Sequence, residues 1–210
     1  MKVIAFGGPA QAGKSTIAGI LAGIALDAGY RIKRLEFAGP LKKAAARVGA
    51  SKSKDPTRYR DLCQKWGAGK RAGDPEYWVK RVRKQLRKLA ETEHSHYLKH
   101  SRWDETVVIL DDCRYLNEID LVREFNGRMI FVDPGYRLSD EDLSEDFRKH
   151  ESEQLAFEYM NGEHKDTLFD DVIVNGEDDL KTLAAVVTLV APSWFDDLDL
   201  MLWEDDSCMD

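Results

Sequence analysis

Residues 7–16, GGPAQAGKST, bring glycines, a lysine and two hydroxyl side chains together in one short run near the start of the chain. From Gly8 to Ser15 the run fits the pattern G-x-x-x-x-G-K-[ST] without a gap. Glycines let the backbone turn so that successive N–H groups point inward and bind phosphate oxygens. Lys14 adds a charge for the outer phosphates, and the Ser15 hydroxyl can bind Mg²⁺. The pattern predicts a cradle for a nucleoside triphosphate; the alternative is a flexible glycine-rich turn.

Such a cradle needs a strand before it and a helix after it, and the flanking sequence predicts both. Residues 2–6, KVIAF, are typical of a short buried strand, and residues 14–28 carry an apolar stripe at helical spacing. Strands and helices then alternate, which predicts an α/β fold with a parallel sheet and right-handed crossovers. The further strands are expected at 32–37, 106–112, 128–133 and 171–175, and the further helices at 41–48, 57–66, 75–93, 117–124, 139–159 (in two pieces) and 178–190.

Two acids end the most apolar of these strands. Residues 107–110 are wholly apolar, which is typical of a central parallel strand, and Asp111 and Asp112 follow directly. An acid at the end of a neighbouring strand helps to hold the metal ion in phosphoryl-transfer sites of this kind. We expect one of the two to do so here; the alternative is a helix cap or a surface ion pair.

Cations beyond Lys14 are needed to bring two polyanions together. Most of the basic residues between Lys70 and Arg87 are expected to form the solvated face of an amphipathic helix. Arg71 is the expected exception, because the turn that follows it would direct it toward the ligand-binding end of the sheet. Arg137 and Arg148 flank a polar segment that could close over the site.

Composition excludes several classes of protein. The net charge of −7 comes entirely from residues 196–210, which hold seven acids and no base, while the rest of the chain holds 31 acidic and 31 basic residues. A neutral body argues against a nucleic-acid binder. No apolar run approaches the roughly 20 residues of a membrane span. Three widely spaced cysteines suit neither a disulfide framework nor a zinc site, so a reducing cytoplasm is expected. His96 and His100 lack a third ligand, which favours a surface role.

Several segments together resemble the bacteriophage deoxynucleoside monophosphate kinases, a group of P-loop nucleotide kinases. The resemblance spans most of residues 1–190, and its narrower part is the order of a D-x-R-x-x-N-E element and an H-x-S-E element. The matching segments are 8–16, 37–42, 64–67 with Arg71, 74–79, 112–118, 150–153 and the closing strand with Asn175.

The resemblance implies a P-loop kinase fold with a five-stranded parallel sheet, flanking helices, a helical acceptor-binding insert over about 41–102 and a lid over about 134–160. The kinase domain would span 1–195, before an acidic tail at 196–210. It implies transfer of the γ-phosphoryl group of ATP to a dNMP with Mg²⁺, in a host cytoplasm if phage-encoded. Small nucleotides would be its partners, without polymer or membrane, and a homodimer is compatible.

The resemblance also assigns residues to roles, and it prefers Asp112 to Asp111. Catalytic roles fall to Lys14, Arg71, Asp112, Arg114 and Arg137, and metal binding falls to Ser15 and Asp112. ATP would be bound by Gly8, Gln11, Ala12, Gly13, Lys14, Ser15, Thr16 and Asn175. The acceptor would be bound by Phe37, Gly39, Leu41, Lys42, Gln64, Arg71, Trp78, Asp112, Arg114, Glu118, His150 and Glu153.

Two departures from the family pattern leave the acceptor open. The family commonly has Asp where this chain has Gly39, and Arg just after the fourth strand, where this chain has Asp133-Pro134. A kinase for another small phosphorylated acceptor, such as dephospho-coenzyme A or a ribonucleotide, is one alternative. A nucleotide-binding regulatory module is the other, although the chain lacks the N-K-x-D signal that reads guanine.

Overall fold

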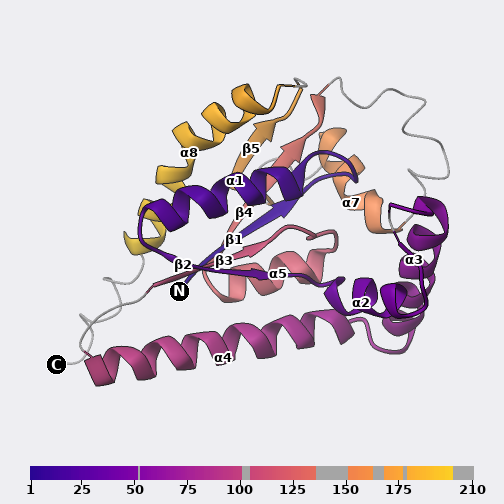
Figure 1. The fold of residues 1–210 in the computed structure, drawn as a ribbon, viewed down its shortest axis with the longest axis horizontal. Helices are drawn as coiled ribbons and strands as arrows, with labels where there is room; N and C mark the ends of the chain where they lie inside the picture. The colour runs from indigo at the N-terminus through magenta and orange to yellow at the C-terminus, as the bar shows by residue number, and fades with distance from the viewer. Residues whose placement is uncertain (52, 101–104, 136–150, 163–167, 177–178, 201–210) are drawn as a thin grey trace.

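A five-stranded parallel sheet forms the centre of the molecule (Figure 1). The computed structural model describes the chain apart from residues 52, 101–104, 136–150, 163–167, 177–178 and 201–210, and the side chains of 100, 152 and 196–200 are also left undescribed. The strands lie in the order β2-β3-β1-β4-β5, and each neighbouring pair is parallel. The predicted α/β fold with a five-stranded parallel sheet and flanking helices is confirmed. The strands are β1 (Lys2–Gly7), β2 (Arg31–Leu35), β3 (Thr106–Leu110), β4 (Arg128–Asp133) and β5 (Asp171–Val174).

Each face of the sheet has its own apolar core. Val3 and Ala5 of β1 point into one cluster, which α4 (Tyr77–His100) and α5 (Leu116–Glu124) cover. Ile4 and Phe6 point into the other, which α1 (Lys14–Asp27) and α8 (Leu180–Leu200) cover (Figure 1). Successive side chains of a strand alternate between faces, so a strand covered on both sides must be apolar throughout. This explains why residues 3–6 and 107–110 form unbroken apolar runs.

The carboxyl ends of the strands are flanked by three helices, α2 (Gly39–Arg47), α3 (Pro56–Gly73) and α7 (Glu151–Met160) (Figure 1). Within the segment expected to form a helical insert, α2 and α3 lie past the end of the sheet. The third helix, α4, differs from that expectation because its apolar residues Val79, Val82 and Leu86 are buried against the face of the sheet. The face-covering role of α4 leaves α2, α3 and α7 around the end where a ligand would bind.

The last helix is longer than its sequence pattern predicts. We expected it to end near Val190, but α8 continues through Pro192 to Leu200. Trp194 is fully buried and meets Phe6 edge-on, with ring centroids 6.2 Å apart. The free energy of burying this indole offsets the backbone hydrogen bond that a proline inside a helix removes. Residues up to Phe195 therefore belong to the domain core rather than to a free tail.

Two other helices also extend beyond their expected ends. Helix α3 continues from the predicted end at Trp66 to Gly73, and α4 continues past Glu93 to His100. The glycines at 67, 69 and 73 weaken the helical signal of α3, yet its Gly67 is buried against Leu41. Within the described residues, no helix has the length and apolar character that a membrane crossing requires.

Candidate active site

Two glycines determine the backbone conformation of the loop after β1, which was predicted to bind phosphate. Gly8 and Gly13 have φ of 125° and 97°, in the region that side chains with a Cβ rarely adopt. A Cβ at Gly8 would collide with the Val132 carbonyl oxygen of β4, and one at Gly13 would collide with the Asn175 amide nitrogen. Helix α1 begins directly after Gly13, so its N-terminal amides face the loop. Both glycines are therefore required by conformation and by space.

Asn175 supports this loop from behind. Its Nδ2 donates a hydrogen bond of 2.8 Å to the Ala12 carbonyl oxygen, and the side chain is buried. Its Oδ1 atom is buried without a hydrogen-bond partner. Asn175 was expected to bind ATP, but it does not line the cavity beside the loop. The structure thus gives it a positioning contact with the loop backbone.

The lysine of the loop is buried and its charge is disfavoured. Lys14 is 7% exposed, and its Nζ donates to the carbonyl oxygens of Gly8 at 2.5 Å and Pro9 at 2.6 Å. Burial, and then the positive charge of Arg114, lower the pKa of Lys14 from 10.5 to about 7, although the Glu153 carboxylate opposes this shift. A bound polyphosphate would supply the negative charge that keeps the ammonium protonated.

A single cavity joins this loop to the segment after β2 and to α3. Its volume is about 790 Å³. The side chains of Lys14, Ser15 and Thr16 line one part of it, and Gln11 and Gly13 also contribute. Ten of the twelve residues expected to bind the acceptor line the same cavity: Phe37, Leu41, Lys42, Gln64, Arg71, Trp78, Asp112, Arg114, Glu118 and Glu153. Their separate roles stay predictions, but the structure brings them together.

Other residues with expected roles in the site are not among those that line the cavity. Gly39 does not line the cavity; it begins α2, and a Cβ at this position would lie 3.3 Å from the Glu36 carboxylate. His150 and Arg137 lie outside the described residues, as do Arg148 and most of the expected lid. The sequence assigned no role to several residues that line the cavity: Ala10, Ala38, Pro56, Tyr59, Arg60, Cys63, Gly67 and Tyr115. For Tyr59, Arg60 and Cys63 of α3, only their helical spacing relative to Gln64 could have indicated the cavity.

The two acids after β3 make different contacts. Asp112 accepts hydrogen bonds of 3.0 Å from the backbone N–H groups of both Phe37 and Ala38, which ties the end of β3 to the segment before α2. Burial raises the pKa of Asp112 from its usual value, while Lys42 opposes the shift. Asp111 instead accepts a hydrogen bond of 2.7 Å from the Arg34 guanidinium. Both acids line the cavity, so the choice between them as a metal ligand stays a prediction.

The donor set suits magnesium. The carboxylate oxygens of Asp111 and Asp112 and the hydroxyl of Ser15 are hard oxygen ligands that line one cavity. No cluster of three or more His, Cys, Asp or Glu side chains suited to a metal ion is found in the described part of the chain. Mg²⁺ usually keeps several waters and binds through one or two carboxylates plus substrate phosphates, so this small set is sufficient.

A carboxylate from α7 reaches the phosphate loop. Glu153 is 2% exposed, and its Oε2 accepts a hydrogen bond of 2.8 Å from the Ala10 N–H. Its Oε1 forms an ion pair with the Arg114 guanidinium. The side chain therefore connects three segments that are distant in sequence. In the free protein it binds the Ala10 N–H of the loop and the Arg114 guanidinium, which the resemblance assigns to phosphate binding.

Glu118 fastens the start of α5 beside this group. Its Oε2 accepts from the backbone N–H of Arg114 at 2.7 Å and of Tyr115 at 3.3 Å. Burial, and then the charge of Asp112, raise the pKa of Glu118 from 4.5 to about 8. Glu118 is consequently a buried neutral acid near neutral pH, and it holds the backbone that carries Arg114.

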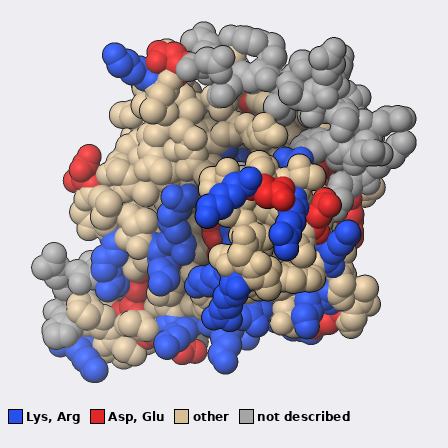
Figure 2. Space-filling model, turned by 45° about the vertical axis from the view of Figure 1, so that its right-hand side comes forward, with Lys and Arg blue, Asp and Glu red and all other residues tan. Residues whose placement is uncertain are grey.

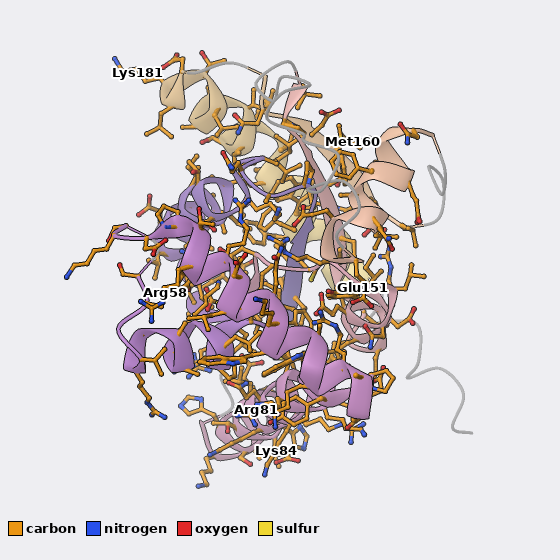
Figure 3. All side chains as sticks on the ribbon, turned by 90° about the vertical axis from the view of Figure 1, so that its right-hand side faces the viewer. Arg58, Arg81, Lys84, Glu151, Met160 and Lys181 are labelled. Atoms are coloured by element: carbon orange, nitrogen blue, oxygen red, sulfur yellow. The ribbon has the colours of Figure 1, made fainter. Side chains whose placement is uncertain are left out.

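Basic side chains of α4 form ion pairs with α5 and do not line the cavity. Arg83 and Arg87 pair with Glu124 of α5 at 2.7 and 3.0 Å. Figure 3 shows Arg81 and Lys84 at the lower edge, away from Glu151 of α7. Lys and Arg side chains crowd the lower half of the face in Figure 2. The sequence predicted that the basic residues between Lys70 and Arg87 form a solvated face with Arg71 as the exception. Arg71 of α3 is the one of them that lines the cavity, and its side chain is 16% exposed.

The comparisons with known proteins found similarity to solved structures alone. No protein-family profile and no curated protein matches the chain. Among solved structures, a gluconokinase from Sinorhizobium meliloti 1021 has 14% identity and a TM-score of 0.48, with 95% of this chain and 97% of that chain covered. A shikimate kinase from Acinetobacter baumannii in complex with shikimate has 12% identity and a TM-score of 0.44 over 92% and 94%. These values leave the activity of this chain to be inferred from its own residues.

Proposed function

We propose that the chain is a nucleoside monophosphate kinase that transfers the γ-phosphoryl group of ATP to a deoxynucleoside monophosphate. The observation that carries the proposal is the single cavity of about 790 Å³ that holds both the phosphate loop and the residues expected to bind the acceptor. Its volume lies in the upper part of the range of small-molecule sites. The resemblance to the phage kinases supplies the acceptor class.

The residues of the cavity are suited to positioning and charge neutralisation. The N–H groups at the start of α1 and the Lys14 side chain would bind the triphosphate, while Arg71, Lys42 and Arg60 line the acceptor side. Mg²⁺, held by Ser15 and Asp112, would neutralise charge on the transferred group. Positioning and electrostatic stabilisation supply most of the acceleration in phosphoryl transfer.

The acceptor needs no general base. The second pKa of a phosphate monoester is about 6, so a nucleotide acceptor is already largely a dianion at neutral pH. Glu153 shields one loop donor and would have to yield the Ala10 N–H if a phosphate oxygen takes that position.

The test is ADP formation from ATP with each dNMP and NMP in turn and with dephospho-coenzyme A, in wild type and two lysine variants. Lys14→Ala removes the loop cation, and we expect at least a roughly 100-fold loss of kcat. Lys43→Ala is the matched control, because Lys43 is exposed and does not line the cavity. Acceptor-independent hydrolysis would favour a regulatory module, and wild-type turnover in Lys14→Ala would refute the site.

A further inference from the structure

A second cavity meets the first beside α7. It has a volume of about 660 Å³ and lies between the end of α3, the start of α5 and the first turns of α7. Three residues, Arg71, Arg114 and Tyr115, line both cavities and so form the junction between them. Arg114 is already engaged by Glu153. Arg71 and Tyr115, by contrast, each have a buried polar atom without a hydrogen-bond partner.

Two buried donors at this junction make no hydrogen bond. The Tyr115 hydroxyl and the Arg71 Nε are both inaccessible to solvent and lack a hydrogen-bond partner. A buried polar group that is left unsatisfied costs about 1–3 kcal/mol. The great majority of buried polar groups are satisfied, and an exception calls for a specific explanation. Here two such atoms belong to residues that contact each other and line both cavities.

The two side chains hold each other in place. The Arg71 guanidinium carbon lies 4.2 Å from the centre of the Tyr115 ring, which is a close cation–π contact. The only ion pair that Arg71 makes within the described residues is with Glu151 at 3.7 Å, and the Glu151 side chain is 60% exposed. Exposed pairs contribute only about 0–1 kcal/mol, so the ion pair with Glu151 does little to oppose binding of a ligand by the guanidinium.

The chemistry of the pair selects an oxyanion. The Arg71 Nε–H can only donate, and burial raises the pKa of Tyr115 to about 12, so its hydroxyl keeps its proton and can donate as well. A neutral carbonyl could accept hydrogen bonds but would not balance the guanidinium charge. A phosphate monoester offers several acceptor oxygens and the opposite charge, and charge-assisted hydrogen bonds of this kind are the strong ones.

We propose that the Tyr115 hydroxyl and the Arg71 Nε together bind the phosphate of the acceptor and make the enzyme select phosphorylated over unphosphorylated acceptors. The inference rests on the proposed function and adds Tyr115 as a specificity-determining residue. An acceptor without the phosphate would leave both donors buried and unpaired, and this is the condition under which polar recognition discriminates most strongly.

The experiment is Tyr115→Phe, which removes only the hydroxyl. Because that oxygen makes no hydrogen bond in the free protein, we expect the free energy of unfolding by urea to stay the same or to increase. The KM for the best dNMP should rise about tenfold, which corresponds to about 1.4 kcal/mol, while the KM for ATP stays the same. Arg71→Lys keeps the charge without the Nε, and it should raise the same KM.

Tyr77→Phe is the matched control, since Tyr77 packs edge-on against Trp78 and lines neither cavity. Binding of each dNMP and its deoxynucleoside is also measured by calorimetry. Tyr115→Phe should weaken the monophosphate and leave the nucleoside unchanged. The inference is overturned if Tyr115→Phe weakens binding of the monophosphate and of the deoxynucleoside equally. It is also overturned if the KM for the acceptor stays within twofold of wild type.

The inference and the proposed function fail in different ways. Acceptor-dependent ADP formation that Tyr115→Phe leaves unchanged overturns the inference alone. If no monophosphate is turned over, the proposed function fails. Inorganic phosphate then decides the inference in the Lys14→Ala background, where the loop site is weakened. A Kd for phosphate that is the same with Tyr115 and with Phe at this position overturns it.

Discussion

The depressed pKa of Lys14 predicts that ATP binding takes up a proton. At pH 8 a group with a pKa of about 7 is roughly nine-tenths neutral, so Lys14 is mostly an uncharged amine in the free protein. A triphosphate beside the amine favours the ammonium and raises its pKa again. We therefore expect an uptake of about 0.9 proton per ATP bound at pH 8 and very little at pH 6, where Lys14 is already charged.

Calorimetry measures this uptake directly. ATP is titrated at pH 8 in HEPES and in Tris, whose ionisation enthalpies differ, and the difference between the observed enthalpies gives the number of protons. Glu118, with a pKa of about 8, could also take up a proton near bound phosphate, so the titration is repeated with Glu118→Gln. Uptake should persist in that variant. Equal enthalpies in both buffers at pH 8 would refute the neutral lysine.

Three further predictions concern the scaffold. Between pH 5 and 7 folded Glu118 keeps a proton that the unfolded chain, with its pKa of 4.5, has lost, so stability falls as pH rises, by about 2.5 kcal/mol over this window. Urea unfolding should show this fall in wild type and not in Glu118→Gln, and a flat wild-type profile contradicts it. Asn175→Ala should cost about 1–3 kcal/mol of stability and raise the KM for ATP, whereas exposed Asn161→Ala should change neither; an unchanged KM would remove the positioning role. Trp194→Ala should cost about 3–5 kcal/mol in thermal unfolding, against a small effect for partly exposed Trp66→Ala, and equal losses would refute the assignment of α8 to the core.

The sheet and the phosphate loop were predictable because their signals are local. A strand buried on both faces must be apolar throughout, as residues 107–110 are, and the spacing of Gly8, Gly13 and Lys14 follows from the backbone that cradles phosphate. The acids after β3 were also found, because they follow a buried strand. Their partners, Arg34 for Asp111 and the backbone at 37–38 for Asp112, are not encoded in any local pattern.

The parts that sequence could not predict depend on contacts between distant segments. Pro192 is a local signal for the end of a helix, but burial of Trp194 against β1 overrides it. The hydrogen bond from Ala10 to Glu153 joins residues 143 positions apart. Tyr115 stands between two residues that the resemblance named, yet its role depends on the Arg71 side chain stacked on its ring.

The position of α8 has a consequence for how the protein is made. Trp194 and Phe195 cover residues near the start of the chain, since Trp194 meets Phe6 and the Lys2 ammonium donates to the Phe195 carbonyl oxygen at 2.8 Å. During translation the first strand and α1 leave the ribosome long before Trp194 and Phe195, which complete the cover over one face of the strand. Until α8 emerges, α1 alone covers that face of β1, and a chain truncated before residue 194 would leave the Phe6 side of the cluster without its Trp194 partner.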